Sequence, residues 1–249
     1  MPVVAQEAVS AADLDRLTVD RLLTTTRSVR KRLDFTRPVE REVIDECMQI
    51  ALQAPTGSNA QRWRWVIVAD AGRRAALGEI YARAFREYLA MATSGTAAGG
   101  IHSGDNDAAR RLSEHLVAKE KMMRSVEYLI DHIHEAPIHI VPCVVGRLQP
   151  DASSSWISSH FGSVYPAIWS LQLALRSRGL GTCITTAHLG YEEEAAEVLG
   201  IPFAEITQVC LLPVAYYTGE TFRPTKRRPM GEVVFWERFD PASLQETGW

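Results

Sequence analysis

The chain has 249 residues, 46% hydrophobic and 23% charged, which is ordinary globular composition and enough for one large α/β domain. Its formal net charge of −3 argues against nucleic acid or an anionic membrane as the partner of the whole molecule. No apolar run approaches the roughly 20 residues that span a bilayer, and residues 1–15 lack the basic and apolar regions of a secretory signal. We therefore expect a cytoplasmic protein with a flexible lead over residues 1–12 and a single domain over residues 13–249.

Helices and strands are expected to alternate along the chain. Apolar periodicity and end signals predict helices over residues 14–23, 43–54, 71–91, 108–134, 161–178 and 191–199. The pattern over residues 161–178 is the strongest and predicts a central core helix. Apolar and β-branched runs predict strands over residues 63–70, 136–146, 182–187 and 206–216. Helices alternating with four such strands predict an α+β or α/β sandwich around one sheet.

The C-terminal residues 233–239 are apolar although they follow a basic stretch, residues 223–228. Such a segment suits an extra strand, or an arm packed on a neighbouring chain. The sequence therefore indicates a dimer.

Two glycine-containing stretches do not form nucleotide-binding motifs. Residues 94–107 are rich in glycine and small polar residues, which is typical of a mobile lid or binding loop. Ile101 and His102 stand where a P-loop needs lysine and a hydroxyl residue, so no triphosphate grip is expected there. Ile184 replaces the third glycine of a dinucleotide fingerprint that would begin at Gly179.

Other catalytic and metal-binding patterns are missing from the sequence. The four cysteines have no paired spacing and sit in apolar segments, which predicts buried free thiols. The seven histidines form no HExxH motif, so no metal site is expected. No serine lies in a GxSxG elbow, which argues against an acyl-enzyme hydrolase. Three glutamates from Glu192 to Glu194 begin a predicted helix, where acidic residues have a structural role.

A basic cluster near the N-terminus, residues 24–32, places Arg27, Ser28 and Arg30 at one turn. Two guanidinium groups and a hydroxyl suit a phosphate or another planar anionic group, because guanidinium forks match phosphate oxygens two at a time. The cluster taken alone also fits a solvated basic turn or a small nucleic-acid patch.

Four segments, in the same order, resemble the FMN-dependent nitroreductase family. They are residues 27–30, residues 54–63, residues 163–186 and residues 211–214 with 226–229. The first is similar to the family's Arg-Arg-Ser-x-Arg motif, and the second to its A-P-S/T-G-x-N-x-Q-x-W turn. Together the segments span nearly the whole chain, and the ordered set is more specific than any one of them.

The resemblance implies an α+β fold: an α/β sandwich with a central mixed sheet flanked by helices and a C-terminal arm exchanged in a homodimer. It further implies FMN at the subunit interface, touched by both chains. No catalytic side chain is implied, because the flavin carries the chemistry. The residues implied at the cofactor are Arg27, Ser28, Arg30 and Arg227 around its phosphate, ribityl chain and pyrimidine side; Pro55, Thr56, Asn59 and Gln61 from the partner subunit; and the backbone of Thr185 and Thr186 near flavin N5.

The implied activity is a ping-pong oxidoreductase reaction. NADH or NADPH gives a hydride to flavin N5 and leaves, and a small acceptor, by default a nitroaromatic or a quinone, then takes the electrons. Arg30 is the candidate for positive charge beside the flavin, and the loop over residues 94–107 would set acceptor size. The alternatives are a reductive dehalogenase or ene-reductase on the same fold, and a non-catalytic flavin-binding protein.

Three positions depart from the family pattern. Thr26 stands where the family often has its first arginine, Arg62 replaces a frequent proline, and Ala215 replaces a frequent glycine. We expect these changes to alter loop geometry or substrate shape without removing the site.

Overall fold

The computed structural model describes residues 16–94, 120, 123–149 and 151–241. The expected flexible lead over residues 1–12 and the candidate lid over residues 95–107 lie outside the described residues. The chain divides into two compact units, residues 26–220 and residues 1–25 with 221–249. The predicted single domain stays a prediction, and each unit is described by itself.

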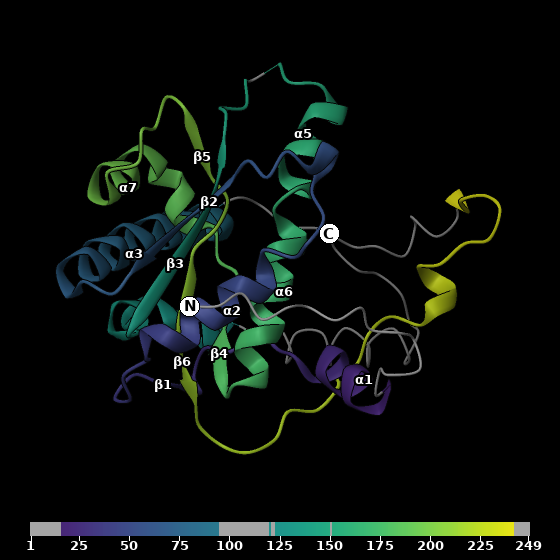
Figure 1. Ribbon diagram of the computed structural model, residues 1–249, viewed down its shortest axis with the longest axis horizontal. Coiled ribbons are helices and arrows are strands. Elements are labelled where there is room, and N and C mark those ends of the chain that lie inside the picture. Colours follow the sequence, from purple (N-terminus) through teal and green to yellow (C-terminus); the bar gives the residue numbers. More distant parts are fainter. Residues whose placement is uncertain (1–15, 95–119, 121–122, 150, 242–249) are drawn as a thin grey trace, which may run out of the picture. The chain divides into compact units, whose positions relative to one another are not determined.

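A six-stranded sheet forms the centre of the unit that spans residues 26–220 (Figure 1). Its main path runs β1 (Leu33–Asp34), β6 (Leu212–Tyr217), β3 (Ile138–Val145) and β2 (Trp63–Val68), while β4 (Leu180–Thr182) pairs with β6 and β5 (Ile206–Gln208) pairs with β3. All of these pairs are antiparallel. The predicted α+β class is confirmed.

The expected mixture of strand directions is wrong for the strands of this sheet. Within the described residues the parallel component is one isolated bridge, between Gly146 and Ile206. Seven of the eight positions of β3 are buried, and all of its residues except His139 are apolar, which is typical of parallel strands covered on both faces. Here helices cover both faces of an antiparallel sheet instead.

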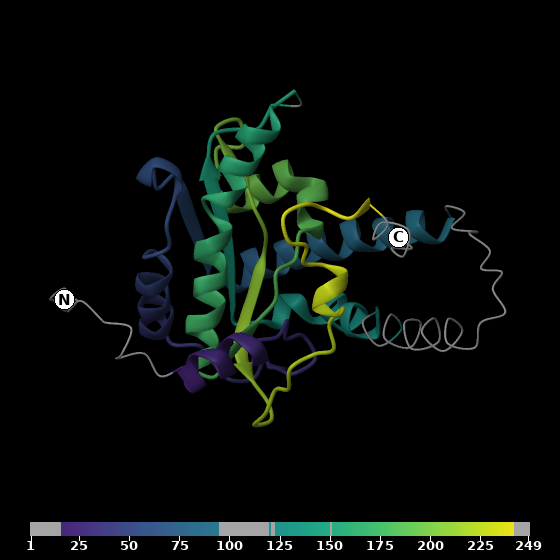
Figure 2. The same cartoon turned by 90° about the vertical axis from the view of Figure 1, so that its right-hand side faces the viewer.

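Alternate residues of β3 point into two hydrophobic clusters, because successive side chains of a strand face opposite sides of the sheet. Ile138, Ile140 and Val144 join one cluster, together with α2 (Arg41–Ala51) and α6 (Tyr165–Ser177). Val141 and Cys143 join the other, together with α3 (Ala71–Ser94), the helix over residues 123–132 and α7 (Glu192–Leu199). Figure 2 shows these helices on either side of the strands.

The predicted core helix over residues 161–178 is two helices. α5 (Ser154–Gly162) ends before α6, and Phe161 belongs to α5. Pro166 lies in the first turn of α6, where its missing N–H costs no hydrogen bond, so the helix begins there and not earlier. The predicted end is confirmed, since Gly179 follows with a φ of 79°.

The predicted strand over residues 206–216 also divides, because its middle residues change partner. Val209 N–H donates to the carbonyl oxygen of Pro142 at 2.9 Å, and Leu211 exchanges hydrogen bonds with Thr185. The predicted strand over residues 182–187 correspondingly shrinks to β4, which begins at Leu180, and the Thr185–Leu211 bridge.

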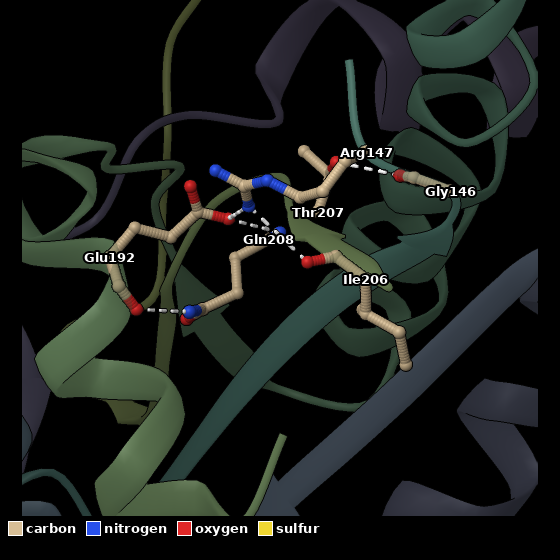
Figure 3. Close-up of polar contacts among 6 residues, drawn as sticks. All are labelled: Gly146, Arg147, Glu192, Ile206, Thr207 and Gln208. Atoms are coloured by element: carbon tan, nitrogen blue, oxygen red, sulfur yellow. Dashed lines mark hydrogen bonds and ion pairs between the residues drawn. The ribbon is translucent and has the colours of Figure 1, made fainter. Parts of the chain in front are cut away.

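The first residue of α7 ties that helix to β5 (Figure 3). The Glu192 carboxylate accepts from Arg147 Nη1 at 2.6 Å and from the Gln208 N–H at 2.8 Å. The Glu192 carbonyl accepts from Gln208 Nε2 at 2.8 Å, and the Arg147 guanidinium lies 4.1 Å from the centre of the Phe203 ring. The structural role predicted for this acidic helix start is confirmed.

The other unit contains α1 (Arg16–Thr25) and a short 3₁₀ turn, η5 (Met230–Glu232). Residues 233–239 form no strand, so the expectation of an extra strand is wrong for this chain by itself. Val233, Val234, Trp236 and Phe239 are exposed there. Exchange of this segment in a dimer stays a prediction. In the described part of the chain, no helix has the length and apolar character needed to cross a membrane.

Candidate functional site

Val29 fixes the basic segment to the sheet. Its side chain is buried, and its N–H donates to the carbonyl oxygen of Thr182 in β4 at 2.9 Å. Beneath it lies Gly181, where an added Cβ would come within 3.0 Å of the Val29 side chain. A side chain here would require Val29 to move by a few tenths of an ångström, so glycine favours this close approach. The turn is closed by Leu33, whose N–H donates to the carbonyl oxygen of Arg30 at 3.1 Å.

The three predicted anion-binding residues flank this buried anchor. Arg27 and Arg30 are half-buried and Ser28 is exposed, on either side of Val29. Two cations and a hydroxyl are therefore held on one short turn whose backbone is fixed by hydrogen bonds at Val29 and Leu33. This arrangement can bind a phosphate or another anionic group.

Arg30 lies beside two buried groups that the sequence analysis did not assign to the site, Tyr81 and Cys183. Burial raises the pKa of Tyr81 to about 12, against the opposing effects of hydrogen bonding to Thr185 and the positive charge of Arg30. Burial likewise raises the pKa of Cys183 to about 11, against the charge and hydrogen bonding of Arg30. Both groups are neutral at neutral pH, so Arg30 supplies the formal charge of this cluster. The structure thus brings the predicted residues Arg30 and Thr185 together.

Thr185 and Thr186 differ in what their backbone can offer a ligand. The Thr185 N–H donates to the Leu211 carbonyl oxygen at 3.0 Å, and the Thr185 carbonyl accepts from the Leu211 N–H at 2.8 Å. Thr186 is exposed and precedes η4 (Ala187–Tyr191). Its N–H has no acceptor among the residues that the structure describes. Of the two predicted backbone donors, Thr186 is the one available.

The second predicted group lies on the turn around η2 (Gly57–Asn59), after α2. Pro55, Asn59 and Gln61 are exposed, and Thr56 is half-buried. The Gln61 side-chain Nε2 donates to Asn59 Oδ1 at 3.1 Å, and the Gln61 N–H donates to Thr56 Oγ1 at 3.3 Å. The amide and hydroxyl side chains of this turn therefore form one hydrogen-bonded set.

The backbone of this turn is strained. Ser58, Asn59 and Gln61 have φ values of 52°, 50° and 46°, in the left-handed region that side chains other than asparagine and aspartate seldom adopt. Clustered outliers of this kind are typical of ligand-binding segments held by their surroundings.

A serine that the sequence analysis did not assign to the site holds the strained turn in place. Ser163 Oγ accepts from the Gly57 N–H at 3.1 Å and donates to the Ser159 carbonyl oxygen at 2.7 Å. The turn is thereby attached to the junction between α5 and α6. In the sequence, Pro166 is the signal of a helix break that could have pointed to Ser163.

The remaining predicted residue, Arg227, is exposed and lies in the unit that contains α1 and η5. Within the described residues, no hydrogen bond or ion pair joins the Arg27–Arg30 turn to the strained turn. The predicted site residues that lie in the unit spanning residues 26–220 therefore form two separate sets in this chain.

Of the departures from the family pattern, Ala215 is fully buried in β6 opposite Gly181. No group of three or more possible metal ligands occurs in the part of the chain that the structure describes.

Comparisons with known proteins identify the family of this chain. The chain is 27% identical over 220 residues to NADH dehydrogenase of Thermus thermophilus, covering 84% of this chain and 91% of that protein. Its fold is similar to that of iodotyrosine deiodinase bound to FMN and 3-iodo-L-tyrosine, with a TM-score of 0.59 and 21% identity over 86% of this chain and 96% of that one. It is also similar to the FMN-dependent nitroreductase NfnB of Mycobacterium smegmatis in complex with NADPH, with a TM-score of 0.61 and 18% identity over 89% and 99% of the two chains. The model of the Nitroreductase family matches residues 23–216, and the chain therefore belongs to this family.

Proposed function

We propose that this chain is an FMN-dependent oxidoreductase that uses NADH or NADPH to reduce a small acceptor such as a nitroaromatic compound or a quinone. The observation that carries the proposal is that Arg30 and Thr185 both act on Tyr81 in a chain of the nitroreductase family. Thr186, next in the chain, has an N–H with no acceptor among the described residues. The names of its relatives, which include FMN, NADPH and NADH, support the cofactor and the donor.

The residues present fit FMN by their chemistry. A phosphate needs charged donors, which Arg27 and Arg30 supply on a turn fixed by Val29. Arg227 is the proposed additional phosphate contact. The hydrogen-bonding edge of a flavin ring needs paired donors and acceptors, which the amides of Asn59 and Gln61 supply.

When bound, FMN would supply the redox chemistry, with N5 as the site of hydride transfer. The residues of the chain would position the cofactor and polarise it. The Thr186 N–H is the proposed donor to N5, and the Thr185–Leu211 bridge holds that backbone in place. Arg30 supplies fixed positive charge where negative charge develops on the cofactor, which lowers the barrier by electrostatic stabilisation.

A homodimer is part of the proposal, because the strained turn and the Arg27–Arg30 turn form separate sets within one chain. Tyr165 and Trp169 support it: they are 39% and 42% exposed on α6, whose opposite face is the buried core. A helix with apolar residues on both faces needs cover on both faces. Pairing two chains through this face would cover it.

Reductive dehalogenation stays open as an alternative acceptor chemistry, since iodotyrosine deiodinase shares the fold. An ene-reductase is open in the same way. A screen of nitro, quinone, halophenol and enone acceptors with one NADPH-reduced preparation distinguishes the three.

The test of the proposed function begins with colour. We expect the purified protein to be yellow, with absorbance bands in the near ultraviolet and the blue, and to release FMN on denaturation. NADH or NADPH added without oxygen should bleach the blue band, and an acceptor should restore it. Colourless protein that does not take up added FMN contradicts the cofactor assignment, and a bound flavin that is never bleached identifies a non-catalytic flavin-binding protein.

A further inference from the structure

A cavity of about 180 Å³ lies beside the strained turn. Its lining includes Ser58, Gln61 and Arg62 from the turn, and Trp156, His160 and Ser163 from α5 and the α5–α6 junction. Gln61 is also a proposed flavin contact, so the cavity adjoins the proposed flavin site.

Arg62 gives this cavity an uncompensated positive charge. Its side chain is exposed, and no carboxylate pairs with it among the described residues. Its guanidinium carbon lies 5.8 Å from the centre of the Trp156 ring. The family pattern that the chain resembles has a proline here more often, so the charge distinguishes this chain.

The part of the lining that comes from α5 offers an aromatic ring and a neutral polar side chain. Trp156 is 44% exposed, and its ring centre is 6.1 Å from that of His160, one turn further along α5. His160 is 5% exposed, and its buried Nε2 has no hydrogen-bond partner in the described structure. Burial, together with the nearby Arg62 charge, lowers the pKa of His160, so its ring is neutral at neutral pH. An unpaired buried polar group is costly unless a ligand satisfies it.

The volume of the cavity matches a small ligand. An engineered cavity of about 150 Å³ in another protein holds one benzene molecule, whereas sites for larger organic ligands span about 300 Å³ or more. A single aromatic ring therefore matches this cavity in size. The guanidinium favours a planar anion on that ring, because carboxylates match its donors two at a time.

We propose that this cavity selects an acceptor with a single aromatic ring and a carboxylate, held by Arg62 at the carboxylate and by Trp156 at the ring. This inference rests on the proposed function and names its substrate class. Ser58 supplies a neutral hydrogen-bonding group in the lining. Selection of aromatic carboxylates would then follow from a residue at which this chain departs from its family pattern.

Binding of benzoate and of its neutral analogue benzamide tests the inference without turnover. Both would be titrated calorimetrically into the oxidised, FMN-loaded protein at low salt. We expect benzoate to bind at least tenfold more tightly than benzamide, and Arg62→Met to abolish that preference, because a hydrogen bond to a charged group typically changes affinity by a factor of about 10 to 100. Trp156→Ala should weaken both ligands.

Arg41→Met is the matched control, since it removes the same charge from an exposed position on α2 outside the cavity. It should leave both affinities within about twofold. In steady-state assays, Arg62→Met should raise the KM for 4-nitrobenzoate about tenfold or more and leave its kcat and the KM for 4-nitrobenzamide nearly unchanged.

Equal binding of benzoate and benzamide, or a benzoate preference that survives Arg62→Met, overturns the inference. That outcome leaves the proposed function intact if the protein still binds FMN and is bleached by NADPH. If the protein binds no FMN, the proposed function fails instead, and the same titrations on the flavin-free chain still decide whether the cavity prefers the carboxylate.

Discussion

The N–H of Val29 and the carbonyl oxygen of Thr182 are joined by a hydrogen bond of 2.9 Å, which ties a basic turn near the start of the chain to a short central strand. After the strand ends, the chain passes through Cys183 to the Thr185–Leu211 bridge. One backbone connection therefore positions the cations of the turn and the Thr186 amide, which has no acceptor in the described part of the chain.

Gly181→Ala should disturb this connection. The new Cβ would lie 3.0 Å from Val29 and 3.1 Å from Leu33, so the turn must move away from β4. We expect a loss of about 1 to 3 kcal/mol in the free energy of unfolding and weaker FMN binding. Gly162→Ala is the control, because a Cβ there meets nothing within 4 Å. Denaturant unfolding and flavin fluorescence titration measure both effects, and equal behaviour of the two variants would argue against the close approach.

Arg227→Ala should weaken FMN binding by about 1 to 3 kcal/mol, the scale of a hydrogen bond to a charged group. The loss should shrink at high salt, since the contact is electrostatic. Equilibrium dialysis of FMN against the variant and the parent protein measures it. Unchanged flavin affinity would remove Arg227 from the phosphate site.

Tyr81→Phe removes one buried hydroxyl and keeps the ring. Because this hydroxyl lies with Thr185 and Arg30, we expect FMN affinity to fall several-fold while the fold persists. Tyr88→Phe on the same helix is the control, since Tyr88 is 61% exposed. The dissociation constant of FMN, from flavin fluorescence, separates the two variants; an equal value for both would show that the Tyr81 hydroxyl does not act on the site.

Arg147→Met should lower the free energy of unfolding by about 1 to 3 kcal/mol, because it leaves the Glu192 carboxylate, whose side chain is only 14% exposed, without its cation. The double variant with Arg147→Met and Glu192→Gln should lose less free energy of unfolding than the two single variants lose in sum, as expected for directly interacting residues. Arg41→Met, which breaks an exposed pair, should change stability by less than about 0.5 kcal/mol. Additive single changes would mean that the Arg147–Glu192 pair is not coupled.

Acid should destabilise the protein through two buried histidines. Burial lowers the pKa values of His139 and His188 from 6.5 to about 4, so below pH 6.5 the unfolded chain binds protons that the folded chain cannot. Stability is present above that pH and is lost as pH falls towards 4, by on the order of 3 kcal/mol for each histidine.

His188→Leu should reduce the loss of stability as pH falls. It also removes two ring nitrogens that have no partner in the described structure. His134→Gln, at an exposed histidine, should keep the slope of the parent protein. Urea unfolding of the FMN-loaded protein at several pH values provides the comparison. An unchanged slope in His188→Leu would exclude that residue as a cause.

Local signals in the sequence were sufficient for several elements. The helix that ends before Pro55 and the strand that begins at Trp63 follow from periodicity and turn residues, and both are confirmed. The two-residue strand β1 carries no periodic signal, and the break between α5 and α6 depends on how Pro166 enters a helix. These features depend on pairing and packing partners far away in the chain.

The candidate site shows the same division. Motif resemblance predicted roles for Arg30 and Thr185, because those positions recur in family patterns. Tyr81 and Cys183 were missed, since their proximity to Arg30 arises only when α3 and β4 pack against the same turn. The bridge between Thr185 and Leu211 occupies the Thr185 amide and leaves the Thr186 amide as the available one, and no local sequence pattern reveals that bridge.

All four cysteines of the chain are buried free thiols, as predicted, and burial raises their pKa values. The folded protein should therefore resist alkylating reagents. Any opening that exposes one of these cysteines to solvent would lead to its irreversible alkylation, at a residue that can be identified. Pulsed alkylation read by mass spectrometry can follow local and global opening without an added probe. A single cysteine introduced on the surface would also be the one site that a dye or spin label can reach.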